Sequence, residues 1–240
     1  MLTLSELRIK VFADGADFES MMRLYAKPYI NGFTTNPTLM RKAGIKDYEA
    51  FGKKILAAIP DRPISLEVFA DDFPSMEKQA RVIASWGSNV NVKIPVTDTK
   101  GKFSGELIRR LSAEGIALNV TAIMTLDQIV RVSEALDPNT PAIVSVFAGR
   151  IADTGVDPVP LMTEALKILT IRPKAELLWA SPRELLNIFQ ANKLGTHIIT
   201  VTPDLLQKLD NVGYDLNAFS LDTVKMFYND AMASNFSIEI

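Results

Sequence analysis

The sequence predicts an α/β protein built as a single (β/α)8 barrel, and three observations support this fold class. The chain has 240 residues, close to the roughly 250 of a typical barrel of eight strands and eight helices. Short β-rich runs alternate with longer amphipathic stretches from one end of the chain to the other, a pattern typical of βαβ units and a parallel sheet. No Ser/Gly-rich linker, charge block or low-complexity run divides residues 1–240, so we expect one domain.

Eight runs are predicted strands, each placed to within a few residues. They are Ile9–Asp14, Gly32–Asn36, Ile64–Phe69, Val90–Val96, Ala117–Ala122, Ala142–Phe147, Glu176–Ser181 and His197–Thr202. A flavodoxin-like or doubly wound open sheet is the main alternative, but it needs fewer strands, and no GxGxxG motif follows the first run. We therefore expect the TIM-barrel architecture.

Amphipathic stretches between the runs, such as Ser75–Ser85 and Leu126–Ala135, are predicted helices of the outer layer. Expected helix starts are Asp17 before Phe18, Thr125 before Leu126, Ser181 before Pro182 and Thr202 before Pro203, and expected ends are Gly87 and Gly195. After the last strand, residues 216–240 are predicted to form one more helix, Leu216–Met232, and a tail, Ala233–Ile240. This tail could cover a barrel mouth or a subunit interface.

The composition argues against several kinds of partner. Lys and Arg total 26 against 28 Asp and Glu, a net charge of −2, so no overall field attracts nucleic acid or an anionic membrane. With no cysteine and a single histidine, His197, the chain lacks the ligands of a typical zinc site, which favours chemistry without a metal. Glu6, Arg8 and Lys10 interrupt any signal peptide, and no apolar run reaches the roughly 18 residues of a membrane span, so we expect a cytoplasmic protein.

Polar residues inside the predicted strands are the main sign of function. In Val90–Val96, the alternation of a strand places the valines and Ile94 on one face and Lys93 on the other, toward the barrel interior. A strand lysine is more often a solvated edge residue when considered alone. Here, however, the same alternation directs other polar or aromatic side chains inward or to strand ends: Asp14, Thr34, Asn36, Glu67, Asn119, Thr121, Ser145 and Phe147.

These residues suit a particular chemistry. A lysine held among apolar walls loses solvation of its charged form, and the neutral amine can attack a carbonyl to form a Schiff base. Glu67 and Asp14 are the candidates for proton transfer, and Thr121 can hold a water. Arg150 and Arg183 follow adjacent strands and are expected to bind an anion with Ser181, although a surface ion pair is the ordinary explanation for either arginine alone.

Seven segments together resemble the transaldolase family, in the short form that shares a fold with fructose-6-phosphate aldolase. They are the strand ending at Asp14, Gly32-Phe-Thr-Thr-Asn-Pro37, Leu66-Glu-Val68, Val92-Lys-Ile-Pro95, Asn119-Val-Thr121, Ser145-Val-Phe-Ala-Gly-Arg-Ile151 and Ala180-Ser-Pro-Arg183. The resemblance covers nearly the whole chain. It implies a cofactor-independent enzyme of the pentose phosphate pathway that moves a dihydroxyacetone unit from a ketose phosphate, such as sedoheptulose 7-phosphate or fructose 6-phosphate, to an aldose phosphate. Oligomerisation with copies of the same chain is expected from the resemblance alone.

The resemblance also implies residue roles. Lys93 matches the Schiff-base lysine, Asp14 the acid/base aspartate, and Glu67 with Thr121 the pair that holds the catalytic water. The expected substrate contacts are Thr34, Asn36, Asn119, Ser145 and Phe147, with Arg150, Ser181 and Arg183 around the phosphate.

Two alternatives stay open at this point. One is an aldolase that releases free dihydroxyacetone, and the other is a sugar-phosphate-binding homologue without activity. Members that release dihydroxyacetone tend to have glutamine and tyrosine where this chain has Glu67 and Phe147, so transfer is favoured. Departures from the family pattern at Val146, Ala148, Trp179, Pro182 and Glu184 leave the identity of the substrate open.

Overall fold

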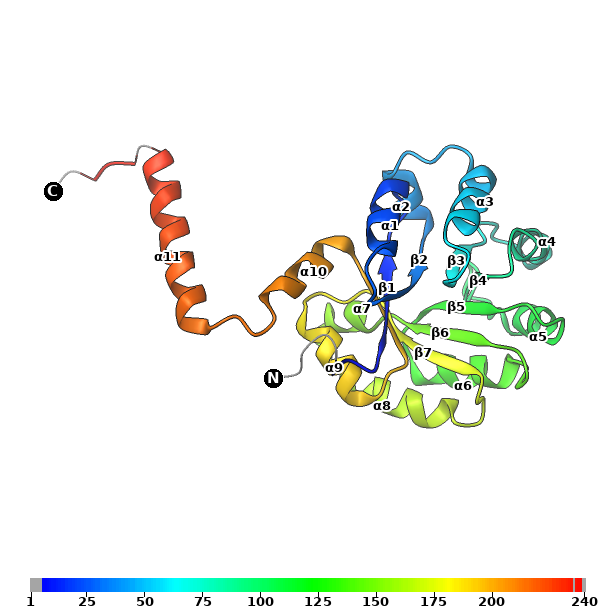
Figure 1. Ribbon diagram of the computed structural model, residues 1–240. Helices are drawn as coiled ribbons and strands as arrows, with labels where there is room; N and C mark the ends of the chain where they lie inside the picture. The colour runs from blue at the N-terminus through cyan, green and yellow to red at the C-terminus, as the bar shows by residue number, and fades with distance from the viewer. Residues whose placement is uncertain (1–5, 235, 239–240) are drawn as a thin grey trace.

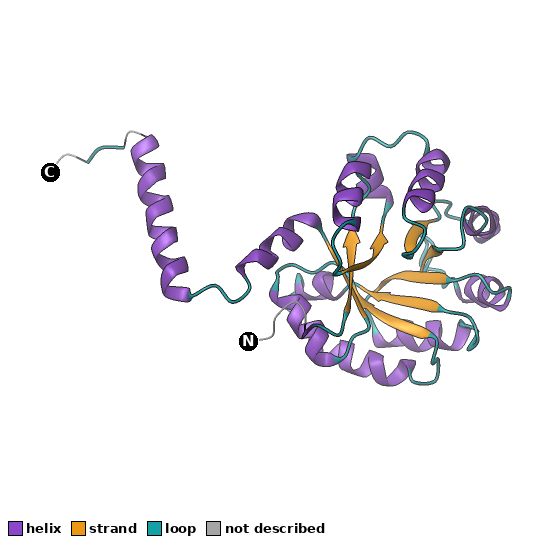
Figure 2. Cartoon of the chain, in the orientation of Figure 1, coloured by secondary structure: helices purple, strands orange, loops and turns teal. Residues whose placement is uncertain are grey.

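The computed structural model describes residues 6–234 and 236–238. Residues 1–5, 235 and 239–240, which include parts of the predicted N-terminal segment and tail, lie outside the described residues. Eight parallel strands close into a barrel in the order of the sequence (Figure 2). They are β1 (Lys10–Asp14), β2 (Ile30–Thr34), β3 (Ile64–Glu67), β4 (Val90–Pro95), β5 (Leu118–Ile123), β6 (Ala142–Val146), β7 (Ala175–Trp179) and β8 (Ile198–Val201). The predicted TIM barrel is confirmed.

Helices surround the barrel (Figure 1). They are α1 (Phe18–Tyr25), α2 (Pro37–Lys42), α3 (Tyr48–Ala58), α4 (Phe73–Ala84), α5 (Gly105–Ala113), α6 (Leu126–Ala135), α7 (Ala148–Ala152), α8 (Pro158–Leu169), α9 (Leu186–Leu194) and α10 (Pro203–Gln207), followed by the 3-10 turn η2 (Lys208–Asn211). The caps explain most boundaries. Asp17 accepts a hydrogen bond from the Ser20 amide, Thr125 forms a capping box with Gln128, and Gly195 ends α9 with a φ of 82°.

Three predicted boundaries differ from the structure. Helix α4 ends at Ala84 with Ser85 as its C-cap, before the predicted Gly87, and the other two differences lie next to the barrel mouth. The second strand ends at Thr34, because Asn36 accepts a hydrogen bond from the Leu39 amide and begins α2 instead of extending the strand. Ser181 does not begin a helix before Pro182: its φ is 61°, outside the range of a helix cap, and α9 starts only at Leu186. A side-chain helix cap decides the first boundary, and a left-handed backbone decides the second.

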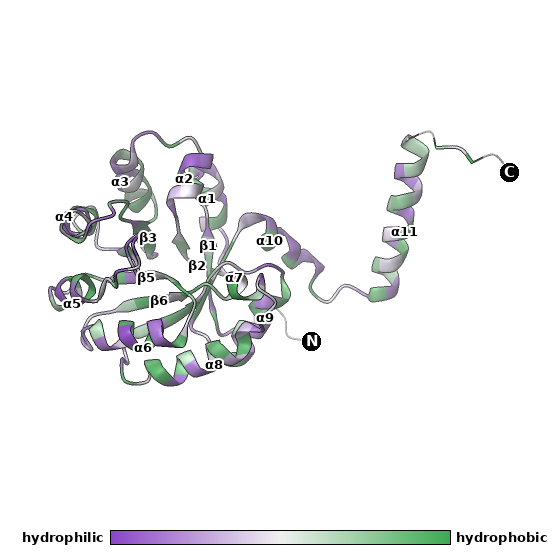
Figure 3. Ribbon diagram, turned by 180° about the vertical axis from the view of Figure 1, so that it is seen from behind, coloured by the Kyte–Doolittle hydropathy of each residue, from purple (hydrophilic) through white to green (hydrophobic). Residues whose placement is uncertain are grey.

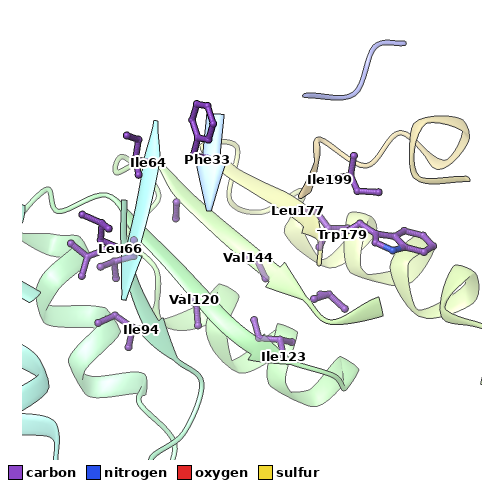
Figure 4. Close-up of a cluster of buried hydrophobic side chains, with 14 of the residues drawn as sticks. Phe33, Ile64, Leu66, Ile94, Val120, Ile123, Val144, Leu177, Trp179 and Ile199 are labelled. Atoms are coloured by element: carbon purple, nitrogen blue, oxygen red, sulfur yellow. The ribbon is translucent and has the colours of Figure 1, made fainter. Parts of the chain in front are cut away.

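The core lies between the strands and the outer helices (Figure 4). The outward residues of β4 show how it forms, since Val90, Val92 and Ile94 are all buried there. A separate apolar cluster of Phe12, Ile143, Leu178, Ala180 and Ile198 packs inside the barrel. Gly32 makes room for this cluster, because a Cβ there would lie 2.6 Å from the Phe12 ring. The interior of the barrel therefore contains apolar side chains in its middle, with polar residues at both ends of the strands, since Lys10, Asn31, Asn91 and Glu176 line a second pocket at the amino ends.

Helix α11 (Leu216–Ala233) confirms the predicted C-terminal helix but lies apart from the barrel (Figure 1). None of its residues is buried, and hydropathy colouring shows apolar positions along it (Figure 3). Its exposed large apolar residues are Leu216, Phe219, Leu221, Val224, Met226, Phe227, Tyr228 and Met232. In the tail, Phe236 and Ile238 are also exposed, so this segment does not cover the mouth of its own barrel. Within residues 6–234 and 236–238, no helix is both long and apolar enough to cross a bilayer.

Candidate active site

A pocket of about 550 Å³ opens at the carboxyl ends of the strands. Every residue predicted from the sequence as part of a site lines it, namely Asp14, Thr34, Asn36, Glu67, Lys93, Asn119, Thr121, Ser145, Phe147, Arg150, Ser181 and Arg183. The barrel topology explains this convergence, since parallel strands bring their carboxyl ends to the same face.

Lys93 lies at the base of this pocket in a buried ion pair. Its side chain is 8% exposed, and its Nζ lies 3.0 Å from Oε2 of Glu67. The register of the sheet pairs the two residues directly, Glu67 on β3 with Lys93 on β4. The Nζ also donates a hydrogen bond of 2.7 Å to the carbonyl oxygen of Thr35. The surroundings of Lys93 are therefore more polar than the apolar walls expected from the sequence, because a carboxylate and a carbonyl both contact its amine.

Asp14 stands at the end of β1 and is held by neighbouring strands. The Thr34 hydroxyl on β2 donates a hydrogen bond of 2.8 Å to Oδ1 of Asp14, and the Thr200 hydroxyl on β8 contacts the Thr34 hydroxyl in turn. Burial raises the pKa of Asp14 above its ordinary value of 3.8, although the positive charge of Lys93 and the hydrogen bond from Thr34 act in the opposite direction. Such a carboxyl group can exchange a proton closer to neutral pH than an exposed one.

Two hydrophilic residues of β5 differ in their hydrogen bonding. Asn119 is fully buried; its Nδ2 donates to the Ser65 hydroxyl at 3.0 Å, and its Oδ1 accepts from the Ser145 hydroxyl at 2.6 Å. The Thr121 hydroxyl is also buried, but has no hydrogen-bond partner within the described residues. Leaving such a group unpaired costs about 1–3 kcal/mol. The next residue, Ala122, has a φ of 64°, and the pairing of β5 with β6 shifts at this point.

The other end of the pocket is built from α7 and the loop between β7 and α9. The Arg150 guanidinium lies 5.3 Å from the ring centroid of Phe147, and Arg183 forms an ion pair with Asp153. Ser181 has a left-handed backbone, and its carbonyl oxygen lies so close to Gly149 that a Cβ there would be 1.5 Å away. Only glycine fits at position 149, so this contact sets how the two arginine-bearing segments meet.

Several residues of this region were not predicted from the sequence. Lys42 and Thr200 line the pocket, whereas Thr35, Gly149 and Asp153 support residues that do. Thr200 could have been found, because it alternates with the apolar Ile199 and Val201 in the last strand and therefore points inward with the other polar residues. No comparable signal marks Asp153 or the carbonyl of Thr35. Within the described residues, no group of three or more His, Cys, Asp or Glu side chains is arranged to hold a metal ion.

The fold and the pocket together define a class: a (β/α)8-barrel protein whose mouth holds a lysine in a buried ion pair, with two arginines at the opposite end. The family model described as transaldolase/fructose-6-phosphate aldolase matches residues 11–239. The chain belongs to this family, and it is an enzyme of the transaldolase type.

Curated relatives agree with the family assignment. The chain is 35% identical over 204 residues to a protein named "probable transaldolase" from Methanococcus maripaludis, covering 85% of this chain and 90% of the relative. It is also 35% identical over 202 residues to "probable transaldolase 2" from Listeria monocytogenes, covering 84% of this chain and 88% of the relative.

Solved structures show the same fold at low sequence identity. The structure of 3-hexulose-6-phosphate synthase from Salmonella typhimurium aligns with a TM-score of 0.56 at 14% identity, covering 81% of this chain and 89% of that one. The structure of 3-keto-L-gulonate-6-phosphate decarboxylase from Vibrio cholerae aligns with a TM-score of 0.54 at 11% identity, covering 82% and 88%. These two likenesses concern the fold alone.

Proposed function

We propose that the protein is a transaldolase that transfers a dihydroxyacetone unit from a ketose phosphate, such as sedoheptulose 7-phosphate or fructose 6-phosphate, to an aldose phosphate. The observation that carries the proposal is the ion pair between Lys93 and Glu67, because it places a buried amine 3.0 Å from a carboxylate that can accept its proton. No cofactor takes part in the proposed reaction.

Schiff-base formation begins inside this ion pair. When the Lys93 ammonium passes a proton to Glu67, the neutral amine adds to the ketone carbon of the donor and forms a carbinolamine. Glu67 then returns the proton to the departing hydroxyl, which leaves as water, and the protonated Schiff base forms. The unpartnered hydroxyl of Thr121 supports a role for this side chain in holding that water together with Glu67.

Asp14 acts on the carbon–carbon bond. In the proposed step it takes the proton of the C4 hydroxyl while the C3–C4 bond breaks, and the electron pair moves into the Schiff base to leave an enamine on Lys93. The aldose phosphate departs. A second aldose phosphate then accepts the three-carbon unit by the reverse steps, and the retained water hydrolyses the product from Lys93. The raised pKa of Asp14 supports this alternation between acid and base.

The remaining pocket residues are proposed to hold the substrate. Asn36 uses its side-chain oxygen to cap α2, which leaves its amide hydrogens for a sugar hydroxyl. Asn119 has one amide hydrogen beyond the bond to Ser65. Thr34, Ser145 and Phe147 complete the walls of the sugar site, and the phosphate is proposed to bind at Arg150, Ser181 and Arg183.

Borohydride trapping tests this proposal. Incubation with fructose 6-phosphate followed by reduction should leave an adduct on Lys93, and an adduct confined to another lysine would contradict the mechanism. Product analysis with and without erythrose 4-phosphate separates transfer from cleavage, since an aldolase would release dihydroxyacetone without the acceptor. A homologue that only binds sugar phosphates would show neither adduct nor turnover.

We also propose that residues 1–240 act as one catalytic domain, in the cytoplasm, as a homo-oligomer in the pentose phosphate pathway. The oligomer is supported by α11, whose apolar residues lie exposed to solvent in a single chain, including Phe227 at 63% exposure. A second copy of this chain is the proposed partner of that helix. Light scattering should show a mass above 26.5 kDa, and Phe227→Asp should lower it; a monomer at every concentration would contradict this.

A further inference from the structure

The arginine end of the pocket contains a carboxylate that the proposed mechanism does not use. Asp153 follows α7 directly and forms two hydrogen bonds with Arg183, from Nε to Oδ1 at 2.8 Å and from Nη2 to Oδ2. Arg183 lines the pocket, and Asp153, which does not line it, is hydrogen-bonded to the Arg183 guanidinium. The Arg183 guanidinium holds the pKa of Asp153 below its ordinary value, so this carboxylate is charged at neutral pH.

Asp153 uses only some of the hydrogen-bond donors of the Arg183 guanidinium. Asp153 occupies the Nε–Nη2 edge of the guanidinium, and the edge that includes Nη1 has no bond to Asp153. The backbone is also fixed, since the amide of Arg183 donates to Oδ1 of Asn187 at 2.8 Å. Both the main chain and the side chain of Arg183 are therefore held while donor groups remain for a ligand.

Fold stability does not account for this pair. The two side chains are 47% and 51% exposed, and exposed ion pairs contribute little to the free energy of unfolding. Arg150 is close enough for its charge to lower the pKa of Asp153 as well. Two guanidinium groups at one end of a pocket repel each other, and a carboxylate beside both offsets that repulsion.

We propose that Asp153 is a positioning residue for the substrate's phosphate group, holding Arg183 in the orientation in which its free edge faces the anion. This inference rests on the proposed function, because it concerns the phosphate end of the same substrate. Asp153 acts through Arg183 and does not touch the substrate. A long arginine side chain loses rotamer freedom when it binds an anion, and holding it in place beforehand removes that cost.

A positioning role and a repulsive role for Asp153 predict opposite changes in the affinity for phosphate. A carboxylate beside an anion site also repels the anion, so Asp153 could instead weaken phosphate binding. If it positions Arg183, Asp153→Ala weakens binding, and Asp153→Asn weakens it less because the amide oxygen still accepts one hydrogen bond. If it repels phosphate, both variants bind phosphate more tightly and to a similar degree.

The experiment compares wild type, Asp153→Ala and Asp153→Asn with the full chain. For Asp153→Ala we expect KM for fructose 6-phosphate to rise roughly two- to tenfold, which corresponds to the about 0.5–1.5 kcal/mol of ordering one flexible side chain. We expect kcat to change little and the KM for unphosphorylated fructose to stay the same. Glu164→Gln is the matched control, since Glu164 pairs with Lys167 in an exposed contact on α8.

A binding measurement separates this inference from the proposed function. Titration with inorganic phosphate by calorimetry, which requires no turnover, should give a weaker Kd for Asp153→Ala than for wild type or Glu164→Gln. A Kd that is unchanged or tighter in Asp153→Ala overturns the positioning role, even if wild type is an active transaldolase. Conversely, an inactive wild type with the expected phosphate Kd values would contradict the proposed reaction and leave the role of Asp153 in anion binding intact.

Discussion

The two ends of the pocket are built from different kinds of structure. At the lysine end, Lys93 and Glu67 extend from paired strands and their side chains are 8% and 17% exposed. At the arginine end, Arg183 and Asp153 extend from a loop and a helix end, and their side chains are 47% and 51% exposed. The first pair is held by the sheet, whereas the second depends on contacts between two surface segments.

We propose that the lysine end carries out the reaction and that the arginine end selects substrates with a phosphate group. Groups at the lysine end are proposed to contact the part of the substrate that every ketose shares, so changes there should affect all substrates alike. Groups at the arginine end are proposed to contact only the phosphate, so changes there should leave an unphosphorylated substrate unaffected. Substitutions at each end of the pocket test this separation.

Lys93→Met should have the largest effect. Without the amine the proposed Schiff base cannot form, and we expect turnover to fall by roughly 10⁴-fold or more for both phosphorylated and unphosphorylated substrates. Turnover measured with fructose 6-phosphate and with fructose, in the presence of erythrose 4-phosphate, checks this. The double variant Lys93→Met, Glu67→Gln controls for folding, because it removes the carboxylate that Lys93→Met leaves without its cationic partner. A loss confined to phosphorylated substrates would contradict the division of the pocket.

Asp14→Asn should lower turnover by about 10²–10⁴-fold, the usual contribution of a general acid or base, again without regard to phosphorylation. The same substitution should change the pH dependence of stability. Because burial raises the pKa of Asp14, the folded protein holds this proton more tightly than the unfolded chain does. The stabilisation is complete below the ordinary pKa of 3.8 and is lost as the pH rises through the folded pKa.

Urea unfolding at several pH values measures that effect. Relative to Asp14→Asn, which does not titrate, wild type should lose stability as the pH rises from acid toward neutral. If wild type gained stability over the same range, the carboxyl group would be better solvated or better paired than its position at the end of β1 indicates.

The lysine end could be predicted from the sequence because strand alternation is a regular rule. Lys93, Glu67, Asn119 and Thr121 all occupy inward positions of runs that are otherwise apolar, and the closed barrel brings such positions together. Their partners could not be predicted. The bond from Lys93 to the Thr35 carbonyl joins backbone and side chain across the barrel, and no spacing in the sequence encodes it.

For the arginine end, the sequence predicted which residues line the pocket but not how they are arranged. Arg150, Ser181 and Arg183 do line the pocket, but Ser181 was expected to cap a helix and instead adopts a left-handed backbone. The Ser181 carbonyl oxygen lies against Gly149, which belongs to another segment. The pairing of Asp153 with Arg183 joins the same two segments, and residues that meet in this way leave no periodic signal in the sequence.

Gly149→Ala tests the arginine end through its backbone. The new Cβ would lie 1.5 Å from the Ser181 carbonyl oxygen, so the loop that carries Ser181 and Arg183 must move. A displacement of about 1 Å can cost roughly 10²-fold in rate. We expect a loss of that size in kcat/KM for fructose 6-phosphate and little change for fructose. Gly155→Ala is a control for general strain, since Gly155 has a φ of 81° but nothing within 4 Å of its Cβ position. Equal losses for both substrates would show that the two ends are coupled.

Thr34→Val should have the smallest effect, at the lysine end. The Thr34 hydroxyl lowers the pKa of Asp14 by donating a hydrogen bond to its carboxylate, so removing it should raise that pKa further. Lys93 and Glu67, whose charges also act on Asp14, stay in place. Because the proposed base is the ionised carboxylate, the acidic limb of the pH profile of kcat/KM should move to higher pH.

Thr34→Ser is the matched variant for this measurement, since serine keeps the hydroxyl and should leave the limb where it is in wild type. The shift expected for Thr34→Val should appear equally with fructose and fructose 6-phosphate, because it acts on Asp14 and not on the phosphate. A shift seen with only one substrate, or one toward lower pH, would mean that Thr34 serves mainly to contact the sugar. In that case the hydrogen bond to Asp14 would be replaced when substrate binds, and the lysine end would be less fixed than its burial indicates.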